Sequence, residues 1–246
     1  MAATSKKRRK GLRITLISIL LVFTLLTGGV LVVMLNPCPA DQSAIESFLP
    51  EAADGVTDGS YTVFAPDDPV AGFIFYPGAR VEHEAYIPLM QACAAKDILC
   101  ILVEMPMDFP LLWGNAADGL QDKYPEIDQW YIGGHSLGGY MAAGYLGDHA
   151  DDYVGLILMA SYTETDLSGT GLDVLTIYGS EDSVLNKERY EKGLTLLPEG
   201  YTEIVIDGGC HAYFGMYTGQ DGGDLPVTNA EQLLMTADAI RTFVEK

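Results

Sequence analysis

The sequence predicts an α/β fold in which a mostly parallel, doubly wound sheet is covered by helices on both faces. Two observations carry this prediction. Short apolar runs recur along the chain, as expected of strands that are buried on both faces. Segments of helical length separate these runs, and such alternation is typical of a parallel sheet. With 246 residues, 48% apolar and 20% charged, the chain is large enough for one core of ordinary domain size.

The order of the expected elements follows from these patterns. The expected strands are Ser60–Phe64, Val70–Tyr76, Ile98–Glu104, Gln129–Gly133, Val154–Met159, Leu172–Tyr178 and Thr202–Ile206. The expected helices are Glu84–Lys96, Ala116–Tyr124, Leu137–Gly147, Ser183–Leu197 and Asn229–Glu245, with a short helix before them that Asp41 caps and that runs to Phe48. Functional loops of such a sheet gather at the carboxyl ends of its strands.

Charge divides the chain into a basic beginning and an acidic body. Six of the 14 Lys and Arg residues lie within residues 1–13, whereas all 34 acidic residues lie at Asp41 or beyond. A body this acidic repels nucleic acid, so we expect no nucleic-acid partner. The four cysteines, Cys38, Cys93, Cys100 and Cys210, lack the spacing of a zinc site, and neither a metal nor a cofactor is expected.

Residues 14–35 form a run of 22 residues without a charge, directly after the basic cluster. As a helix this run would be roughly 33 Å long, which matches the hydrocarbon core of a bilayer at about 30 Å. The positive-inside rule then predicts a single-pass signal-anchor at the cell membrane, with residues 1–13 as a cytoplasmic tail and the body outside. A cleaved signal peptide is the alternative, although the prolines at positions 37 and 39 are unfavourable for cleavage. Residues 36–57 are expected to be a tether with the short helix, and residues 58–246 the folded domain.

The motif G-x-S-x-G occurs at Gly134–Gly138, between an expected strand and an expected helix. In that context the motif predicts a nucleophile elbow, a sharp turn that exposes the serine hydroxyl. Gly134 and Gly138 are needed because side chains at those positions would clash with neighbouring strands. The helix that follows points its positive end at the site. Ser136 is therefore the expected nucleophile.

A serine nucleophile needs a general base, and only four histidines exist. His135 lies in the elbow, where its side chain is expected to point away from Ser136, and His149 lies too far along the helix. His211 follows the last strand in a glycine-rich loop and is the expected base, with His83 as its competitor. The base needs a carboxylate to orient it, and Asp182 after the Leu172–Tyr178 strand gives the order Ser, Asp, His. Glu181 is the alternative acid.

Two backbone amides are needed to stabilise the oxyanion of the tetrahedral intermediate. We expect them from Leu137, directly after the nucleophile, and from Ala79 in the loop after the Val70–Tyr76 strand. The expected residues of the acyl pocket are Met107, Phe109, Leu111, Trp113 and Phe214, although ordinary core packing explains them equally well.

Four segments carry a resemblance to a known family over roughly residues 58–246. They are Phe73–Gly78, Gly133–Gly139, Tyr178–Asp182 and Gly209–Gly215. With them the chain resembles the α/β-hydrolase superfamily, and in particular a lid-less bacterial branch related to dienelactone hydrolase. The resemblance implies Ser136 as nucleophile, Asp182 as acid and His211 as base. About a dozen residues separate Met159 from Leu172, too few for a lid, so an open site is expected.

The expected function is that of a membrane-anchored serine hydrolase, facing outside, which cleaves carboxylic esters of small-molecule acyl substrates through an acyl-enzyme. Two alternatives stay open at this stage. The same triad could serve an amidase, a peptidase or an acyltransferase. A non-catalytic binding domain on the same scaffold is the third possibility, which the complete triad argues against.

Overall fold

The computed structural model describes residues 36–48, 55–220 and 225–246, together with residues 15, 17–22, 24 and 28–29. It divides the chain into two compact units, residues 1–37 and residues 38–246. The expected signal-anchor at 14–35 falls largely outside the described residues, and those of its residues that are described are helical. Within the described part of the chain, no helix has the length and apolar character needed to cross a membrane.

The second unit is built on an eight-stranded sheet with the order β1-β2-β4-β3-β5-β6-β7-β8. Strand β2 pairs antiparallel with both β1 and β4 at one edge, and the pairings from β4 through β3 to β8 are all parallel. The strands are β1 Val56–Asp58, β2 Tyr61–Phe64, β3 Ala71–Tyr76, β4 Ile98–Val103, β5 Trp130–His135, β6 Gly155–Met159, β7 Asp173–Gly179 and β8 Thr202–Ile206. The mostly parallel α/β sheet predicted from the sequence is therefore confirmed.

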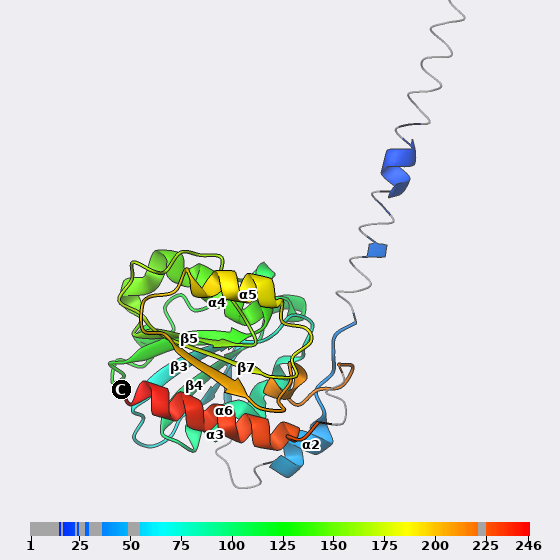
Figure 1. The fold of residues 1–246 in the computed structure, drawn as a ribbon. Helices are drawn as coiled ribbons and strands as arrows, with labels where there is room; N and C mark the ends of the chain where they lie inside the picture. Colours follow the sequence, from blue (N-terminus) through cyan, green and yellow to red (C-terminus); the bar gives the residue numbers. More distant parts are fainter. Residues whose placement is uncertain are drawn as a thin grey trace, which may run out of the picture. The chain divides into compact units, whose positions relative to one another are not determined.

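Helices cover both faces of the sheet (Figure 1). They are α2 Gln42–Phe48, α3 Ile87–Ala94, α4 Leu137–His149, α5 Lys187–Leu194 and α6 Asn229–Val244. Helices α3 and α6 lie on one face, and α4 and α5 lie on the other. Every residue of β3 is buried, and Phe73 and Phe75 belong to a different core layer from Ile74 and Tyr76. This alternation is the period of two that a strand with two covered faces requires.

Three of the helices expected from the sequence differ in the structure, either in type or in the residue at which they begin. The segment Ala116–Tyr124 is not a helix but a series of turns with a short 3-10 helix at Gln121–Lys123. Gly119 has a φ of 70°, which interrupts helical geometry, while the turns still bury Leu120. Helix α5 begins later than expected because the Asn186 side chain accepts a hydrogen bond from the Arg189 amide at 3.0 Å. Helix α3 is preceded by a 3-10 turn, and Pro88 lies in its first turn.

The first residues of the second unit form a strap between two loops of the domain. Cys38 pairs with Val81 and Ala40 pairs with Tyr217 as isolated bridges. The Ala40 amide also donates to the Glu82 carboxylate at 2.9 Å. Helix α2 follows, capped by Asp41 as predicted, since the Asp41 carboxylate accepts from the Ala44 amide at 3.1 Å. The compact unit thus begins at Cys38, within the segment expected to be a tether.

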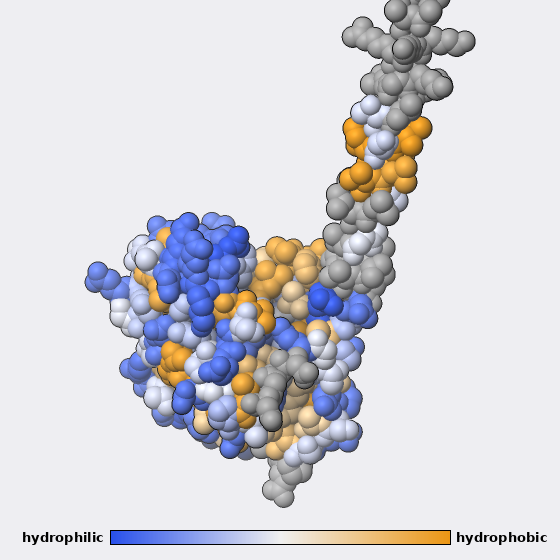
Figure 2. Space-filling view, turned by 45° about the vertical axis from the view of Figure 1, so that its right-hand side comes forward, coloured by the Kyte–Doolittle hydropathy of each residue, from blue (hydrophilic) through white to orange (hydrophobic). Residues whose placement is uncertain are grey.

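One face of the described domain is mainly hydrophilic (Figure 2). Figure 2 shows a face on which hydrophilic side chains predominate and apolar side chains form smaller patches.

All four cysteines are free thiols, and three of them are buried. In the described part of the chain, no cluster of three His, Cys, Asp or Glu side chains is placed to hold a metal ion.

Candidate active site

Ser136 lies at a sharp turn between β5 and α4. Its φ of 52° and ψ of −122° are outside the regions that non-glycine residues usually adopt. The Ser136 amide donates to the Met159 carbonyl at 2.9 Å, which attaches the turn to the end of β6. Such backbone strain persists only where the surrounding structure enforces it, and it is common at functional sites. The local geometry is that of a nucleophile elbow.

Glycines on both sides of Ser136 allow this turn to form. A Cβ atom on Gly134 would lie 2.2 Å from the Tyr76 carbonyl oxygen, and one on Gly138 would lie 2.1 Å from the same atom. Tyr76 ends β3, the strand that neighbours β5. The clash expected from the sequence is therefore with backbone, which cannot rotate out of the way.

Substitution of Gly138 by alanine is expected to destabilise the protein by about 3 kcal/mol or more, because the added methyl group would push helix α4 away from the backbone at the end of β3. Gly144, in the same helix, has no heavy atom within 4 Å of a Cβ placed there and provides the matched control. Gly144→Ala is expected to stabilise the helix by about 0.5–1 kcal/mol. Urea unfolding of both variants measures the difference, and equal stability of the two would contradict the assigned role of Gly138.

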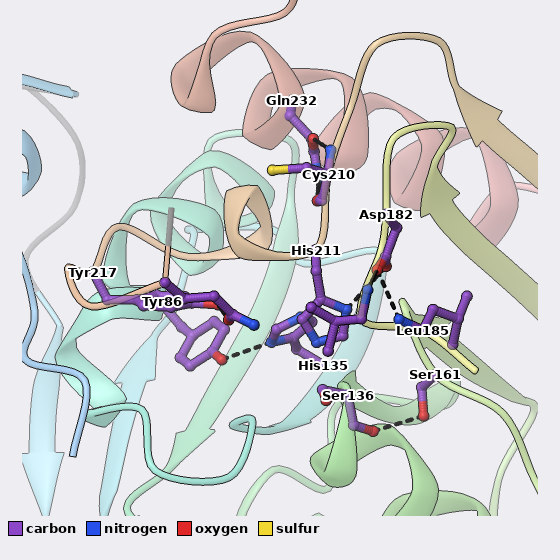
Figure 3. Close-up of polar contacts among 12 residues, drawn as sticks. Tyr86, His135, Ser136, Ser161, Asp182, Leu185, Cys210, His211, Tyr217 and Gln232 are labelled. Atoms are coloured by element: carbon purple, nitrogen blue, oxygen red, sulfur yellow. Dashed lines mark hydrogen bonds and ion pairs between the residues drawn. The ribbon is translucent and has the colours of Figure 1, made fainter. Parts of the chain in front are cut away.

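His211 and Asp182 are brought together by two loops at the carboxyl ends of β7 and β8. Gly179 at the end of β7 packs directly on the backbone of Gly209, where a Cβ would lie 2.1 Å away. The Glu181 amide donates to the Gly209 carbonyl at 2.9 Å, which ties the two loops. As a result, the His211 Nδ1 atom lies 2.9 Å from Asp182 Oδ2 (Figure 3).

Asp182 is held as a buried carboxylate. Its Oδ1 atom accepts hydrogen bonds from the amides of Leu185 at 2.8 Å and Val184 at 2.9 Å. Burial alone would raise the pKa of Asp182, but the hydrogen bond and charge of His211, together with these two amides, outweigh it and lower the pKa. Asp182 is therefore ionised at neutral pH and can hold His211 with Nδ1 protonated and Nε2 free. The alternative acid, Glu181, is exposed, and its carboxylate accepts a hydrogen bond from the Ser180 hydroxyl at 3.3 Å rather than one from His211.

The other histidines lack this arrangement. His83 pairs with the neighbouring Glu84 at 3.2 Å and does not line the pocket beside Ser136. His149 stacks on Tyr145 with ring centroids 4.0 Å apart. His135 is buried and adjacent to His211, with ring centroids 4.6 Å apart, a contact that the sequence reasoning missed.

A pocket of about 450 Å³ contains both Ser136 and His211 in its lining. Leu137 lines it as well, and the Leu137 amide donates to no other described residue. The Ala79 amide is likewise unused within the described chain, whereas the neighbouring amides of Gly78 and Arg80 donate to Tyr86 and Asp108. Ala79 itself is not among the residues that line the pocket.

Only one of the five apolar residues expected in the acyl pocket lines it. Leu111 lines the pocket, whereas the lining does not include Met107, Phe109, Trp113 or Phe214. Phe214 is fully buried and packs against His135, and Trp113 packs against Tyr61. The pocket walls come instead from loops after β6 and β7. The first of these, 160–172, contains no helix or strand, as the short spacing predicted.

Three side chains that support the site were not found from the sequence. The buried Gln232 side chain accepts from the Cys210 amide at 2.9 Å and donates to the Cys210 carbonyl at 2.8 Å, which fixes the loop before His211 (Figure 3). The Ser161 hydroxyl donates to the Ser136 carbonyl at 2.7 Å. The Tyr86 hydroxyl lies 2.8 Å from His135 Nδ1 and accepts from the Gly78 amide at 3.0 Å. Each of the three side chains contacts a residue that is far away in the sequence, so no local motif predicts it.

Burial and the neighbouring His211 hold the pKa of His135 well below its usual value of 6.5. His135 therefore stays neutral in the native protein while the unfolded chain takes up a proton below pH 6.5. Stability is expected to fall as the pH is lowered through that range, by at most about 1.4 kcal/mol per pH unit for one proton. His135→Gln, which keeps an acceptor for Tyr86, is expected to flatten this dependence in urea unfolding between about pH 7.5 and about pH 5. An unchanged pH dependence would contradict a neutral native His135.

The sheet order, the elbow after β5 and the paired acid and histidine loops after β7 and β8 together define an α/β hydrolase. Residues 72–235 match the profile of the alpha/beta hydrolase family. The chain belongs to that family. A comparison with curated proteins finds no match.

Solved structures of similar fold agree with this assignment. A dienelactone hydrolase from Anabaena variabilis is 12% identical, with a TM-score of 0.56 over 78% of this chain and 95% of that one. A soluble variant of monoglyceride lipase from Saccharomyces cerevisiae, in complex with a substrate analog, is 11% identical, with a TM-score of 0.56 over 77% and 93%. A predicted CIB-like hydrolase from Thermoplasma acidophilum is 16% identical, with a TM-score of 0.53 over 77% and 97%. At these identities the likeness concerns the fold.

Proposed function

We propose that this α/β hydrolase is a serine hydrolase that cleaves carboxylic esters through an acyl-enzyme. The observation that carries the proposal is the pairing of a buried, ionised Asp182 with His211 at a pocket that also contains the strained Ser136. Nucleophile, base and orienting acid are the parts that acyl transfer by a serine requires.

In the proposed reaction, Ser136 Oγ attacks the acyl carbon while His211 Nε2 takes the hydroxyl proton. The oxyanion that forms accepts hydrogen bonds from the Leu137 and Ala79 amides. Collapse of this intermediate breaks the ester bond, and His211 returns the proton to the leaving alcohol. Water then attacks the acyl-enzyme with His211 again as base, which releases the acid and restores the Ser136 hydroxyl.

Hydrolysis of 4-nitrophenyl esters of increasing chain length by the purified full-length chain tests the proposal. Covalent labelling by a fluorophosphonate, which reacts with activated serines, is the second readout. We expect both turnover and labelling. A protein that is folded but neither labelled nor active on any ester or anilide would refute the serine hydrolase. Faster cleavage of anilides than of matched esters would favour an amidase instead.

We also propose that residues 14–35 anchor the chain in a membrane, with the hydrolase domain outside. The support is the run of 22 uncharged residues after the basic cluster. In cells that produce the protein, the domain is expected to be cut by externally added protease and to be extracted from membranes only by detergent. Recovery of the intact chain in the soluble fraction would contradict the anchor.

A further inference from the structure

The pocket beside Ser136 has a polar side that the proposed triad does not use. The loops after β6 and β7 contribute Tyr162 and Asn186, and helices α4 and α5 contribute Tyr140 and Arg189. Arg189 is the only Lys, Arg, Asp or Glu residue among the described residues that line the pocket. The pocket lining of a very acidic chain, with a net charge of −20, thus contains one permanent positive charge and no negative one among its described residues.

The guanidinium of Arg189 is oriented by residues of the same pocket. Its Nη1 atom donates to the Tyr162 hydroxyl at 3.1 Å. Glu164 lies close by, with its Oε1 atom 3.8 Å from Nη1, while its Oε2 atom accepts from the Tyr140 hydroxyl at 3.1 Å. The Nε and Nη2 atoms make no hydrogen bond to any other described residue. Donors suited to a planar, two-oxygen partner therefore remain available.

The position of Arg189 on α5 gives no advantage to the helix. It lies in the first turn, where the positive end of the helix dipole disfavours a cation. The pair with Glu164 adds little, because both side chains are more than half exposed and an exposed ion pair with this separation contributes little to stability. A negative group bound between Arg189 and the amino end of α5 would be favoured by both.

We propose that Arg189 selects esters that carry a second, negatively charged group, a carboxylate, in the acyl or alcohol part of the substrate. The inference rests on the proposed ester hydrolysis at Ser136 and names its substrate class. A carboxylate accepts two parallel hydrogen bonds from a guanidinium, and such a bidentate pair outcompetes the weak contact with Glu164. The acidic surface repels anions at long range, so their selection depends on this one local cation.

The test compares matched substrates on the full-length wild type and on Arg189→Gln. The acyl pair is 4-nitrophenyl hydrogen adipate and 4-nitrophenyl hexanoate, and the alcohol pair is 4-acetoxybenzoate and 4-acetoxytoluene. In at least one pair, the wild type is expected to prefer the anionic ester in kcat/KM. The ratio of kcat/KM for the anionic ester to that for the neutral ester is expected to fall by about ten-fold or more in Arg189→Gln. This is the size expected when a hydrogen bond to a charged group is lost. The loss is expected mainly in KM for the anionic ester.

Two further variants separate a local role from a general charge effect. Lys192→Gln removes the same charge from the same helix at a residue outside the pocket and is expected to leave the ratio within about two-fold. Glu164→Gln frees Arg189 and is expected to raise the ratio. An unchanged ratio in Arg189→Gln, or an equal change in Lys192→Gln, overturns the proposal. If the wild type hydrolyses neither member of any pair, the proposal that the protein is an ester hydrolase is refuted. If it hydrolyses the anionic and neutral esters equally well, only the proposed role of Arg189 is refuted.

Discussion

Replacement of Ser136 by alanine is expected to lower kcat by about a million-fold, which is the scale seen when a serine protease loses its nucleophile. The reason is that Ser136 Oγ forms the acyl bond in the proposed mechanism, and no other described hydroxyl is placed at a strained turn beside His211. Fluorophosphonate labelling is expected to disappear completely. Folding is expected to be retained, since the Ser136 contacts that the structure records are made by its backbone.

Ser161→Ala is the matched control for this experiment. Ser161 lines the same pocket, but its hydroxyl is committed to the Ser136 carbonyl at 2.7 Å and is nearly fully buried. The variant is expected to keep fluorophosphonate labelling and to lose less than about ten-fold in kcat, the cost of one supporting hydrogen bond. Labelling that survives in Ser136→Ala and disappears in Ser161→Ala would show that Ser136 is not the nucleophile.

Asp182→Asn is expected to lower kcat by about ten thousand-fold, as found when the acid of a Ser-His-Asp triad is made neutral. The amide that this substitution introduces would face His211 Nδ1 and favour the tautomer in which Nε2 carries the proton and cannot act as base. Steady-state kinetics with a 4-nitrophenyl ester and circular dichroism, to verify folding, give the measurement.

Glu181→Gln gives the comparison for the adjacent carboxylate. Glu181 is exposed and its side chain does not contact His211, so kcat is expected to stay within about two-fold of the wild type. A large loss in Glu181→Gln together with a small one in Asp182→Asn would reverse the assignment of the acid. Each variant removes one negative charge. A difference in kcat between the two variants therefore reflects the position of the carboxylate and not the net charge.

Strand alternation and local motifs carried most of the fold prediction. Buried strands such as β3 and β4 are continuous apolar runs, so they can be recognised from composition alone. The elbow could be found because its chemistry is confined to five consecutive residues. The expected helix at Ala116–Tyr124 failed because the buried positions of a turn around Gly119 have the same spacing as one face of a helix.

The surroundings of the site could be predicted less well because they depend on contacts across the fold. Asp182 and His211 could be paired by strand order, but Gln232 is separated from Cys210 by 22 residues, and Tyr86 from His135 by 49. Of the residues expected in the acyl pocket, Leu111 lines it and the other four do not. Phe214 and Trp113 are large apolar side chains close in sequence to functional loops, yet packing turns them toward other aromatic rings.

The strap at Cys38–Asp41 determines at which residue a fragment that contains the hydrolase domain should begin. Its backbone bonds to both the loop at 80–82 and the loop at 216–218, and these flank the segments that contain Ala79 and His211. A fragment that begins at Gln42 would leave those loop groups to solvent and would lose their support on one side. A fragment that begins at Cys38 therefore keeps the backbone hydrogen bonds of the strap to both loops, whereas a shorter fragment loses part of this support.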